Sequence, residues 1–262
     1  MIFKGLAAPL SPTGLQSVCD ALQVDAQTTW AVATVETRGC GFFVTRKPQM
    51  LFERHVFHRL TNHAFDQSDP DLSNSTPGGY NQPYTDQYLR LADAIELNEQ
   101  AALQSASWGI GQVMGYNATG AGYASVDEMI AAFIDGEDAQ LLATAEFIIN
   151  QNLAAALQRQ DWATFARGYN GPAYGQNDYD KKLQLAFARF GVGPPPDLRT
   201  RAVQVGLMIL ERLDANGVDG LFGKVTQAAI VQYQTDRGLP ITGITDDATV
   251  VDLIAQLGWT QA

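Results

Sequence analysis

Apolar residues recur along most of the chain at the spacing of amphipathic helices, and runs that would form strands are few and short. Thr13, Asp25 and Ser125 each precede such a segment, where a side-chain oxygen can cap the first turn. Gly136 interrupts the pattern once. In the first 190 or so residues the spacing predicts helices at 14–24, 26–37, 52–60, 88–97, 99–106, 126–133, 138–150, 153–160, 162–168 and 179–190.

The last 65 or so residues show a different, more compact pattern. It predicts helices at 198–213, 225–236 and 247–257, joined by loops that contain glycine, with Thr226 and Asp246 near helix starts. Residues 64–85 are rich in Asp, Ser, Asn, Pro and Gly and indicate a long loop, which in a compact domain is usually functional or mobile. The chain is therefore expected to be mainly all-α.

Three consecutive prolines, Pro194 to Pro196, mark the clearest boundary. Such a run disfavours a helix interior and forms a short, stiff spacer. We therefore expect a first domain at 1–192, a Pro-rich linker at 193–198 and a second domain at 199–262.

Composition narrows the classes of function. The 262 residues are 46% hydrophobic, which is ample for a packed core, and carry a net charge of −11. Both parts are acidic and no Lys/Arg run exists, which argues against nucleic acid and anionic membranes as partners. No apolar run is long enough to span a bilayer. The first ten residues do not fit a signal peptide because Pro9 breaks a short apolar run.

Two cysteines, Cys19 and Cys40, exclude a disulfide-rich scaffold. The two could form one disulfide in an oxidising compartment, but the favoured interpretation is two buried thiols.

The first segment with unusual chemistry is 33–43, where Glu36 ends an apolar helix beside a turn that contains Gly39 and Gly41. Apolar neighbours raise a carboxyl pKa, as a general acid near neutral pH requires. The alternative for Glu36 taken alone is a solvated residue at a helix end.

Two further segments carry polar and aromatic groups together. In 107–117, Gln112 and Asn117 offer amide donors and acceptors, Trp108 and Tyr116 offer stacking faces, and the glycines permit close approach. This mixture suits a sugar, although a tight turn packed on a core Trp would look the same. In 166–172, Tyr169 and Asn170 stand at a helix end that Gly171 terminates, which alone is a common C-cap.

Each segment alone is a weak signal, but the order and spacing of the three along the chain are specific. The chain resembles the lysozyme-like superfamily, and most of 10–190 resembles the N-acetylmuramidase domain of phage endolysins, through 35–39, 51–55, 106–109 and 112–117. The resemblance implies a mainly helical lysozyme-like fold and cleavage of the peptidoglycan glycan. It implies that Glu36 is the catalytic acid and that Gln112, Tyr169 and Asn170 lie in the substrate groove. We expect Trp108, Met114 and Asn117 to bind substrate beside them.

Residues 199–259 are similar to the three-helix peptidoglycan-binding module of cell-wall hydrolases, through the 218–223 turn, Tyr233-Gln234 and 243–246. The resemblance implies a wall-binding surface at Asp219, Phe222, Tyr233 and Gln234. The alternative is a helical docking domain without a ligand.

Cleavage of the β-1,4 bond between N-acetylmuramic acid and N-acetylglucosamine then follows, with Glu36 donating a proton to the glycosidic oxygen. Glycosidases typically use a second carboxylate. Glu53 is the first candidate, ahead of Asp66, Asp69 and Asp71, and its alternative role is an ion pair. In the transglycosylase relatives one Glu serves both steps and the product has an anhydro-muramic end, so this outcome stays open.

Two other classes remain as rivals. His55, His58 and His63 lie within nine residues near Glu53, which allows a zinc amidase or peptidase, but the His-Glu-x-x-His pattern is missing. A non-catalytic wall-binding protein is the second rival, and an effector delivered to competing bacteria shares the same chemistry. We expect no cofactor or metal, a monomer, peptidoglycan as the partner, synthesis in a host cytoplasm and action in the periplasm.

Overall fold

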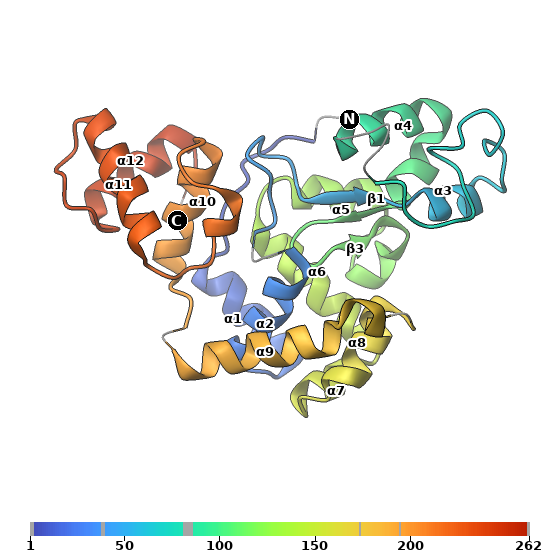
Figure 1. Cartoon of the computed structure of the whole chain (residues 1–262), viewed down its shortest axis with the longest axis horizontal. Coiled ribbons are helices and arrows are strands. Elements are labelled where there is room, and N and C mark those ends of the chain that lie inside the picture. The colour runs from blue at the N-terminus through green and yellow to red at the C-terminus, as the bar shows by residue number, and fades with distance from the viewer. Residues whose placement is uncertain (1–2, 38–39, 81–85, 173, 194, 261–262) are drawn as a thin grey trace.

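A computed structural model describes residues 3–37, 40–80, 86–172, 174–193 and 195–260, without the side chains of Glu36, Thr37 and Gln176. The described part is mainly helical, as expected (Figure 1). Its α-helices are α1 (Pro12–Leu22), α2 (Ala26–Thr37), α3 (Arg54–Leu60), α4 (Gln87–Gln104), α5 (Val126–Phe133), α6 (Glu137–Asn150), α7 (Ala154–Gln158), α8 (Trp162–Asn170), α9 (Tyr179–Val192), α10 (Leu198–Ile209), α11 (Lys224–Arg237) and α12 (Asp247–Leu257).

Helix ends follow local chemistry that the sequence displays. The Asp25 carboxylate accepts from the Thr28 amide at 2.8 Å, and Ser125 accepts from Glu128, so both expected caps are confirmed. Thr13 is wrong as a cap, because Ser11 caps α1 and Pro12 occupies its first turn. The two helices expected on either side of residue 98 follow one another within α4, and the kink between them is at Asn98, whose φ of −162° is not helical.

A small antiparallel sheet supports the cleft described below. It orders β1 (Met50–Phe52), β2 (Ala106–Trp108) and β3 (Val113–Met114), with Leu51 opposite Ser107 and Ser107 opposite Met114. Phe52 and Ala106 were expected in helices and belong to strands instead. Strands of two or three residues are too short to show the alternation by which a sequence reveals a strand.

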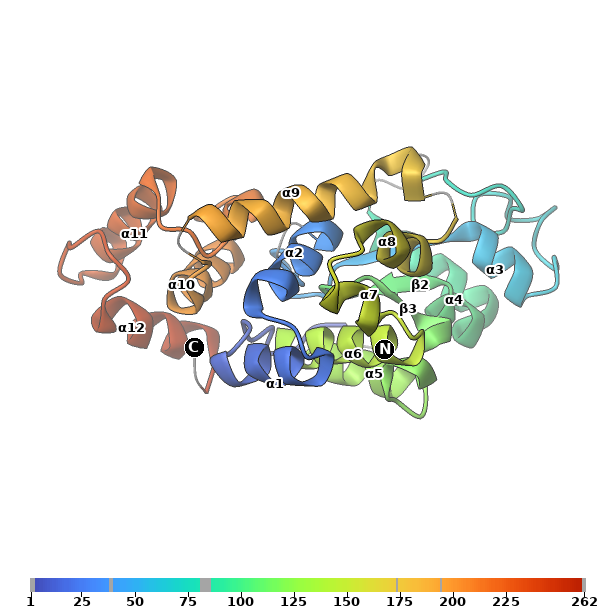
Figure 2. The same ribbon diagram turned by 90° about the horizontal axis from the view of Figure 1, so that it is seen from below.

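The N-terminal part of the molecule is built around α6. Helix α1 packs along α6, and α2 packs along α9, the long helix that runs across the molecule towards α10 (Figure 2). Residues 61–80 form turns rather than a helix, in agreement with the expected loop, of which 81–85 lie outside the described residues. Among the described residues, no helix is long and apolar enough to cross a membrane.

The three last helices, α10 to α12, with their connections form what we call the C-terminal unit. This unit packs directly against the N-terminal part. The segment between α9 and α10 does not separate the two parts as a spacer would. Pro196 is buried, and the Asp197 amide donates to the Gly220 carbonyl at 2.8 Å. One apolar cluster joins both parts, with Cys40 and Phe42 packed among side chains such as Met208.

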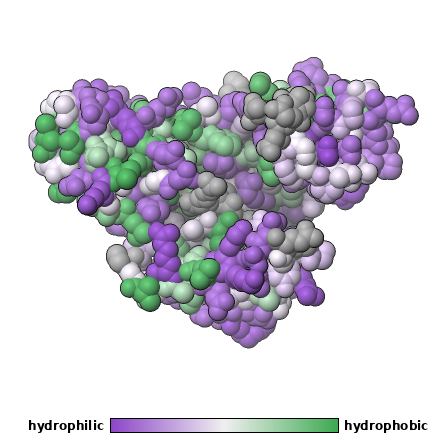
Figure 3. Space-filling model, in the orientation of Figure 1, coloured by the Kyte–Doolittle hydropathy of each residue, from purple (hydrophilic) through white to green (hydrophobic). Residues whose placement is uncertain are grey.

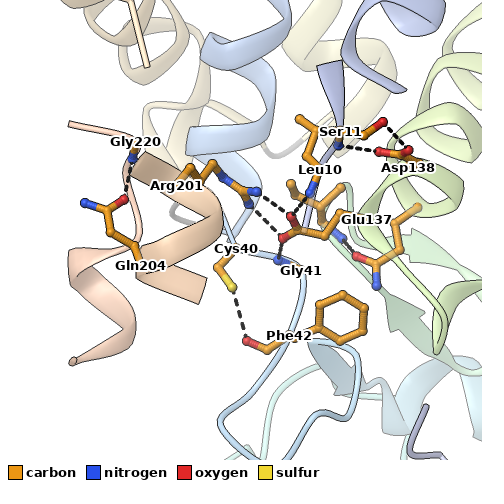
Figure 4. A network of polar contacts seen from close by, with 12 residues as sticks. Leu10, Ser11, Cys40, Gly41, Phe42, Glu137, Asp138, Arg201, Gln204 and Gly220 are labelled. Atoms are coloured by element: carbon orange, nitrogen blue, oxygen red, sulfur yellow. Dashed lines mark hydrogen bonds and ion pairs between the residues drawn. The ribbon is translucent and has the colours of Figure 1, made fainter. Parts of the chain in front are cut away.

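A buried ion pair crosses this junction (Figure 4). Arg201 of α10 forms a two-pronged contact with the carboxylate of Glu137, the first residue of α6, and its Nη2 lies 2.7 Å from Oε1. Both side chains are at most 1% exposed. The same carboxylate accepts from the amides of Leu10 and Gly41 at 2.8 Å each. Four donor contacts thus satisfy this buried anion, which is the condition for burying a charge.

Smaller contacts extend the junction. The Trp259 indole donates to the Leu6 carbonyl at 2.9 Å, and the Arg46 guanidinium donates to the Leu257 carbonyl. Both cysteines are free and buried, so the favoured interpretation of two buried thiols is confirmed. Burial raises the pKa of the Cys40 thiol to about 12, which keeps it protonated and unreactive.

We expect Arg201→Met to destabilise the protein by about 3–5 kcal/mol, because it leaves the Glu137 carboxylate buried without its cation. Arg199→Met, on the same helix, is the matched control. It removes an exposed pair with Asp247 and should cost at most about 1 kcal/mol. Urea unfolding followed by circular dichroism measures both. Equal losses in the two variants would contradict the importance given to the buried pair.

Candidate active site

Glu36 lies in the last turn of α2, where the sequence predicted it. Its side chain is outside the described residues. The chain is described again from Cys40, and the turn there is held firmly. The Gly41 amide donates to buried Glu137, and the Gln49 amide donates to the Gly41 carbonyl at 2.7 Å. The backbone at Gly41 is therefore fixed to α6.

A cleft of about 450 Å³ gathers most of the predicted substrate residues. We call it the active cleft. Five of the six predicted groove residues line it, together with Glu53, although they come from separate segments of the chain. The five are Gln112, Met114, Asn117, Tyr169 and Asn170.

Glu53 precedes α3 and is the carboxylate that lines the active cleft among the described side chains. Both of its oxygens lie 3.0 Å from the Tyr80 hydroxyl, which donates to them, and His55 Nδ1 lies 3.2 Å from Oε2. The side chain of Glu53 is 16% exposed. Its backbone is fixed by the Ser105 carbonyl, which accepts its amide at 2.9 Å.

Burial raises the pKa of the Glu53 carboxyl above its ordinary value. The Tyr80 hydrogen bond, His55 and the buried guanidinium of Arg90 act in the opposite direction. Burial and the Glu53 charge together raise the pKa of Tyr80 to about 12, so Tyr80 stays a donor at neutral pH. A carboxyl poised in this way can exchange a proton nearer neutrality than an exposed one.

Gln112 is held rigidly in the wall of the active cleft. Its Oε1 accepts from Ser107 Oγ at 2.8 Å, and its Nε2 donates to the Gly109 carbonyl at 2.9 Å. Its φ of +51° is unusual for a residue with a side chain. Gly109 and Gly111 were expected to admit a ligand, but they admit α6 instead: a Cβ on Gly111 would lie 2.0 Å from Thr144 Oγ1.

Helix α8 contributes Tyr169 and Asn170 to the active cleft. The Tyr169 hydroxyl donates to the Gly111 carbonyl at 2.6 Å, and its ring stacks on Phe165 with centroids 5.3 Å apart. Asn170 follows at the end of the helix, which Gly171 terminates as expected. The second and third sequence segments therefore touch one another, and both line the active cleft.

Trp108 is the groove residue that does not reach the active cleft. It is fully buried, and its indole donates to the Leu103 carbonyl at 3.1 Å. The alternative of a turn packed on a core Trp therefore describes this residue. His55, considered in the sequence as part of a zinc site, also lines the active cleft, and lining residues that the sequence did not single out include Phe147 and Gln151. Phe147 and Gln151 follow ordinary helix spacing on and after α6, so no local signal distinguishes them.

The residues expected at the wall-binding surface divide into two groups. Gln234 is fully buried and ties its own loop through the amides of Thr242 and Gly243, at 2.9 Å each. Tyr233 is 1% exposed and donates to Asp252. Asp219 contacts Arg189 of α9 at 3.5 Å, whereas Phe222 is 46% exposed. Tyr233 and Gln234 therefore stabilise the fold of the C-terminal unit. Contact of the four residues with the cell wall stays a prediction.

The other acidic and histidine candidates gather away from the active cleft. His58 Nδ1 lies 2.9 Å from both Asp66 oxygens, and the His58 and His63 rings stack at 4.0 Å. These three residues could together hold a metal ion, but none of them lines the active cleft, and neither do Asp69 and Asp71. Glu53 therefore remains the first candidate for a second carboxylate.

A mainly helical fold whose polar cleft holds a desolvated carboxyl and pinned amide groups agrees with a glycoside hydrolase of lysozyme-like type. The N-acetylmuramidase family model matches residues 25–191, and a model of a putative peptidoglycan binding domain matches 196–252. The chain therefore belongs to the N-acetylmuramidase family. It is a glycoside hydrolase that acts on peptidoglycan, as the sequence predicted.

One solved structure supports the same assignment. The crystal structure of the Burkholderia AP3 phage endolysin is 38% identical in sequence, with a TM-score of 0.63. The similarity covers 70% of this chain and 71% of that one. No match was found among curated protein sequences.

Tyr80→Phe should raise the pKa of Glu53 further, because it removes a hydrogen bond that favours the ionised carboxylate. The Glu53 carboxyl can be titrated by carbon-13 NMR and assigned with Glu53→Gln. Tyr116→Phe is the control, since Tyr116 lines the same cleft but makes no hydrogen bond to Glu53. An unchanged or lowered pKa in Tyr80→Phe would contradict the described contact.

Proposed function

We propose that this chain is a modular endolysin that hydrolyses the β-1,4 bond between N-acetylmuramic acid and N-acetylglucosamine, with Glu36 as the general acid. The observation that carries the proposal is the active cleft, which brings five of the six predicted groove residues together with Glu53. Glu36 lies in the last turn of α2, and Gly41, five residues further along the chain, donates its amide to Glu137. The protonated carboxyl would donate to the glycosidic oxygen while positive charge develops on the sugar.

Glu53 is the second carboxylate in this proposal. Its ionised form would take a proton from the attacking water or stabilise the oxocarbenium-like centre. The Tyr80 hydroxyl and Arg90 support that form, although burial opposes it. Activity on the acid side should therefore rise as pH increases through the raised pKa of Glu53, where the base form appears.

The proposal also includes a catalytic domain at 1–192, a linker at 193–198 and a wall-binding domain at 199–262. It also takes the chain to be a monomer. We place its action in the periplasm after synthesis in a host cytoplasm. The similar solved structure is a phage endolysin, and this favours lysis over delivery as an effector. A group that could hold a metal exists only outside the active cleft among the described residues, so a zinc amidase has no support from the geometry.

Glu36→Gln keeps the shape of the side chain and removes its proton, so cleavage of purified peptidoglycan should fall by about 10²–10⁴-fold. Mass spectrometry of the wild-type products should show reducing muramic ends, because water attacks. Glu96→Gln, an exposed change on α4, is the control and should cleave normally. Near-normal cleavage by Glu36→Gln would refute its role, and anhydro-muramic products would assign the enzyme to the transglycosylases.

Retention on the wall should not depend on charge attraction. The chain carries a net charge of −11, and the stem peptides of peptidoglycan carry carboxylates, so the long-range interaction is repulsive. Raising the salt concentration to about 0.15 M shortens the Debye length to about 8 Å and should leave binding to sacculi unchanged or improve it. Co-sedimentation with inactive Glu36→Gln measures this. A steep loss of binding with salt would contradict the proposal.

A further inference from the structure

A second cleft adjoins the active cleft at Gln112, which lines both. It has a volume of about 550 Å³ and lies where the C-terminal unit meets the N-terminal part. The space-filling view is hollowed between these two lobes (Figure 3). We call it the junction cleft. The shared residue, Gln112, has its side-chain amide fixed at both ends.

The C-terminal unit contributes one wall of the junction cleft through Asp214, Ala215 and Asn216. The Asp214 carboxylate accepts from the Asn216 amide at 2.8 Å and from its Nδ2 at 2.7 Å, so the turn is internally braced. The position of this wall depends on the docking of the unit, which the buried pair of Arg201 and Glu137 holds. The wall is therefore a fixed surface rather than the end of a tether.

The lining of the junction cleft is suited to a neutral, hydrogen-bonding ligand. Gln49, Gln87 and Asn216 supply amides, and Phe43 and Met50 supply apolar surface. Gln87 Nε2 donates to the Tyr80 carbonyl at 2.9 Å, whereas its buried Oε1 has no hydrogen-bond partner among the described residues.

A buried acceptor without a partner is costly unless water or a ligand supplies a donor. Hydroxyl and acetamido N–H groups of amino sugars are such donors, and sugar rings have apolar faces for the remaining surface. The single carboxylate of the lining, Asp214, is already engaged by Asn216.

We propose that the junction cleft is an additional saccharide site, in which the glycan strand that is cut in the active cleft is held against the turn of the C-terminal unit. The proposal rests on the proposed function and extends it, since the unit then shapes the substrate groove as well as binding the wall. A strand long enough to pass Gln112 gains this contact, and a short fragment held in the active cleft does not.

Asn216→Trp tests the site, because it places a bulky ring in the junction cleft from an exposed position. The substrates are peptide-free glycan strands from amidase-treated sacculi and a soluble tetrasaccharide of the same repeat. For the long strands kcat/KM should fall about tenfold through KM, the effect of losing ~1.4 kcal/mol of binding. For the tetrasaccharide it should stay within about twofold.

Gln227→Trp, a change at another exposed position, on α11, should alter the cleavage of neither substrate. Asn216→Ala should give a smaller loss in the same direction as Asn216→Trp. Unfolding midpoints of all variants establish that the fold is intact. If Asn216→Trp left the ratio of kcat/KM between the two substrates unchanged, or lowered kcat/KM equally for both, the saccharide site would be overturned. Failure of the wild-type protein to cleave either substrate would instead overturn the proposed function, so the two failures are distinguishable.

Discussion

The carboxylate of Glu137, at the start of α6, lies where three other segments of the chain meet it, and each of these three supplies a donor. Leu10 provides the N-terminal segment, Gly41 the turn after Glu36, and Arg201 the C-terminal unit. A buried charge without these partners is costly, so the four segments are arranged together or not at all. The relative position of the two parts is therefore a property of the core, even though prolines separate them in the sequence.

Helix α6 carries this constraint into the active cleft. It begins at Glu137, receives Gly109 and Gly111 against Gln140 and Thr144 in its middle, and presents Phe147 to the active cleft. The Gln140 side chain accepts from the Ile110 amide at 2.9 Å, which places the segment that ends in Gln112. One helix thus links the docking of the C-terminal unit to the cleft, and its packing leaves little freedom for either.

Local signals in the sequence predicted what local chemistry determines. Helix positions, the caps at Asp25 and Ser125 and the described part of the loop expected at 64–85 follow from spacing and side-chain type. Five of the six groove residues expected from the sequence share a cleft. Burial of particular side chains was not predictable in this way. Trp108 and Gln234 have the residue types of a sugar site, yet both are fully buried, because burial depends on segments distant in the chain. Glu137 shows no signal at all beyond that of an acidic first turn.

The docking of the C-terminal unit changes what a wall-binding domain can contribute. On a flexible linker such a domain raises the local concentration of the enzyme near its substrate but does not orient it. A domain fixed by a buried ion pair and a shared apolar cluster holds the active cleft at one position and angle relative to the bound strand. Binding energy then serves orientation, which accelerates a reaction by bringing the reacting groups into alignment. For a chain of net charge −11 that approaches an anionic wall, short-range orientation is the advantage that remains, because long-range attraction is absent.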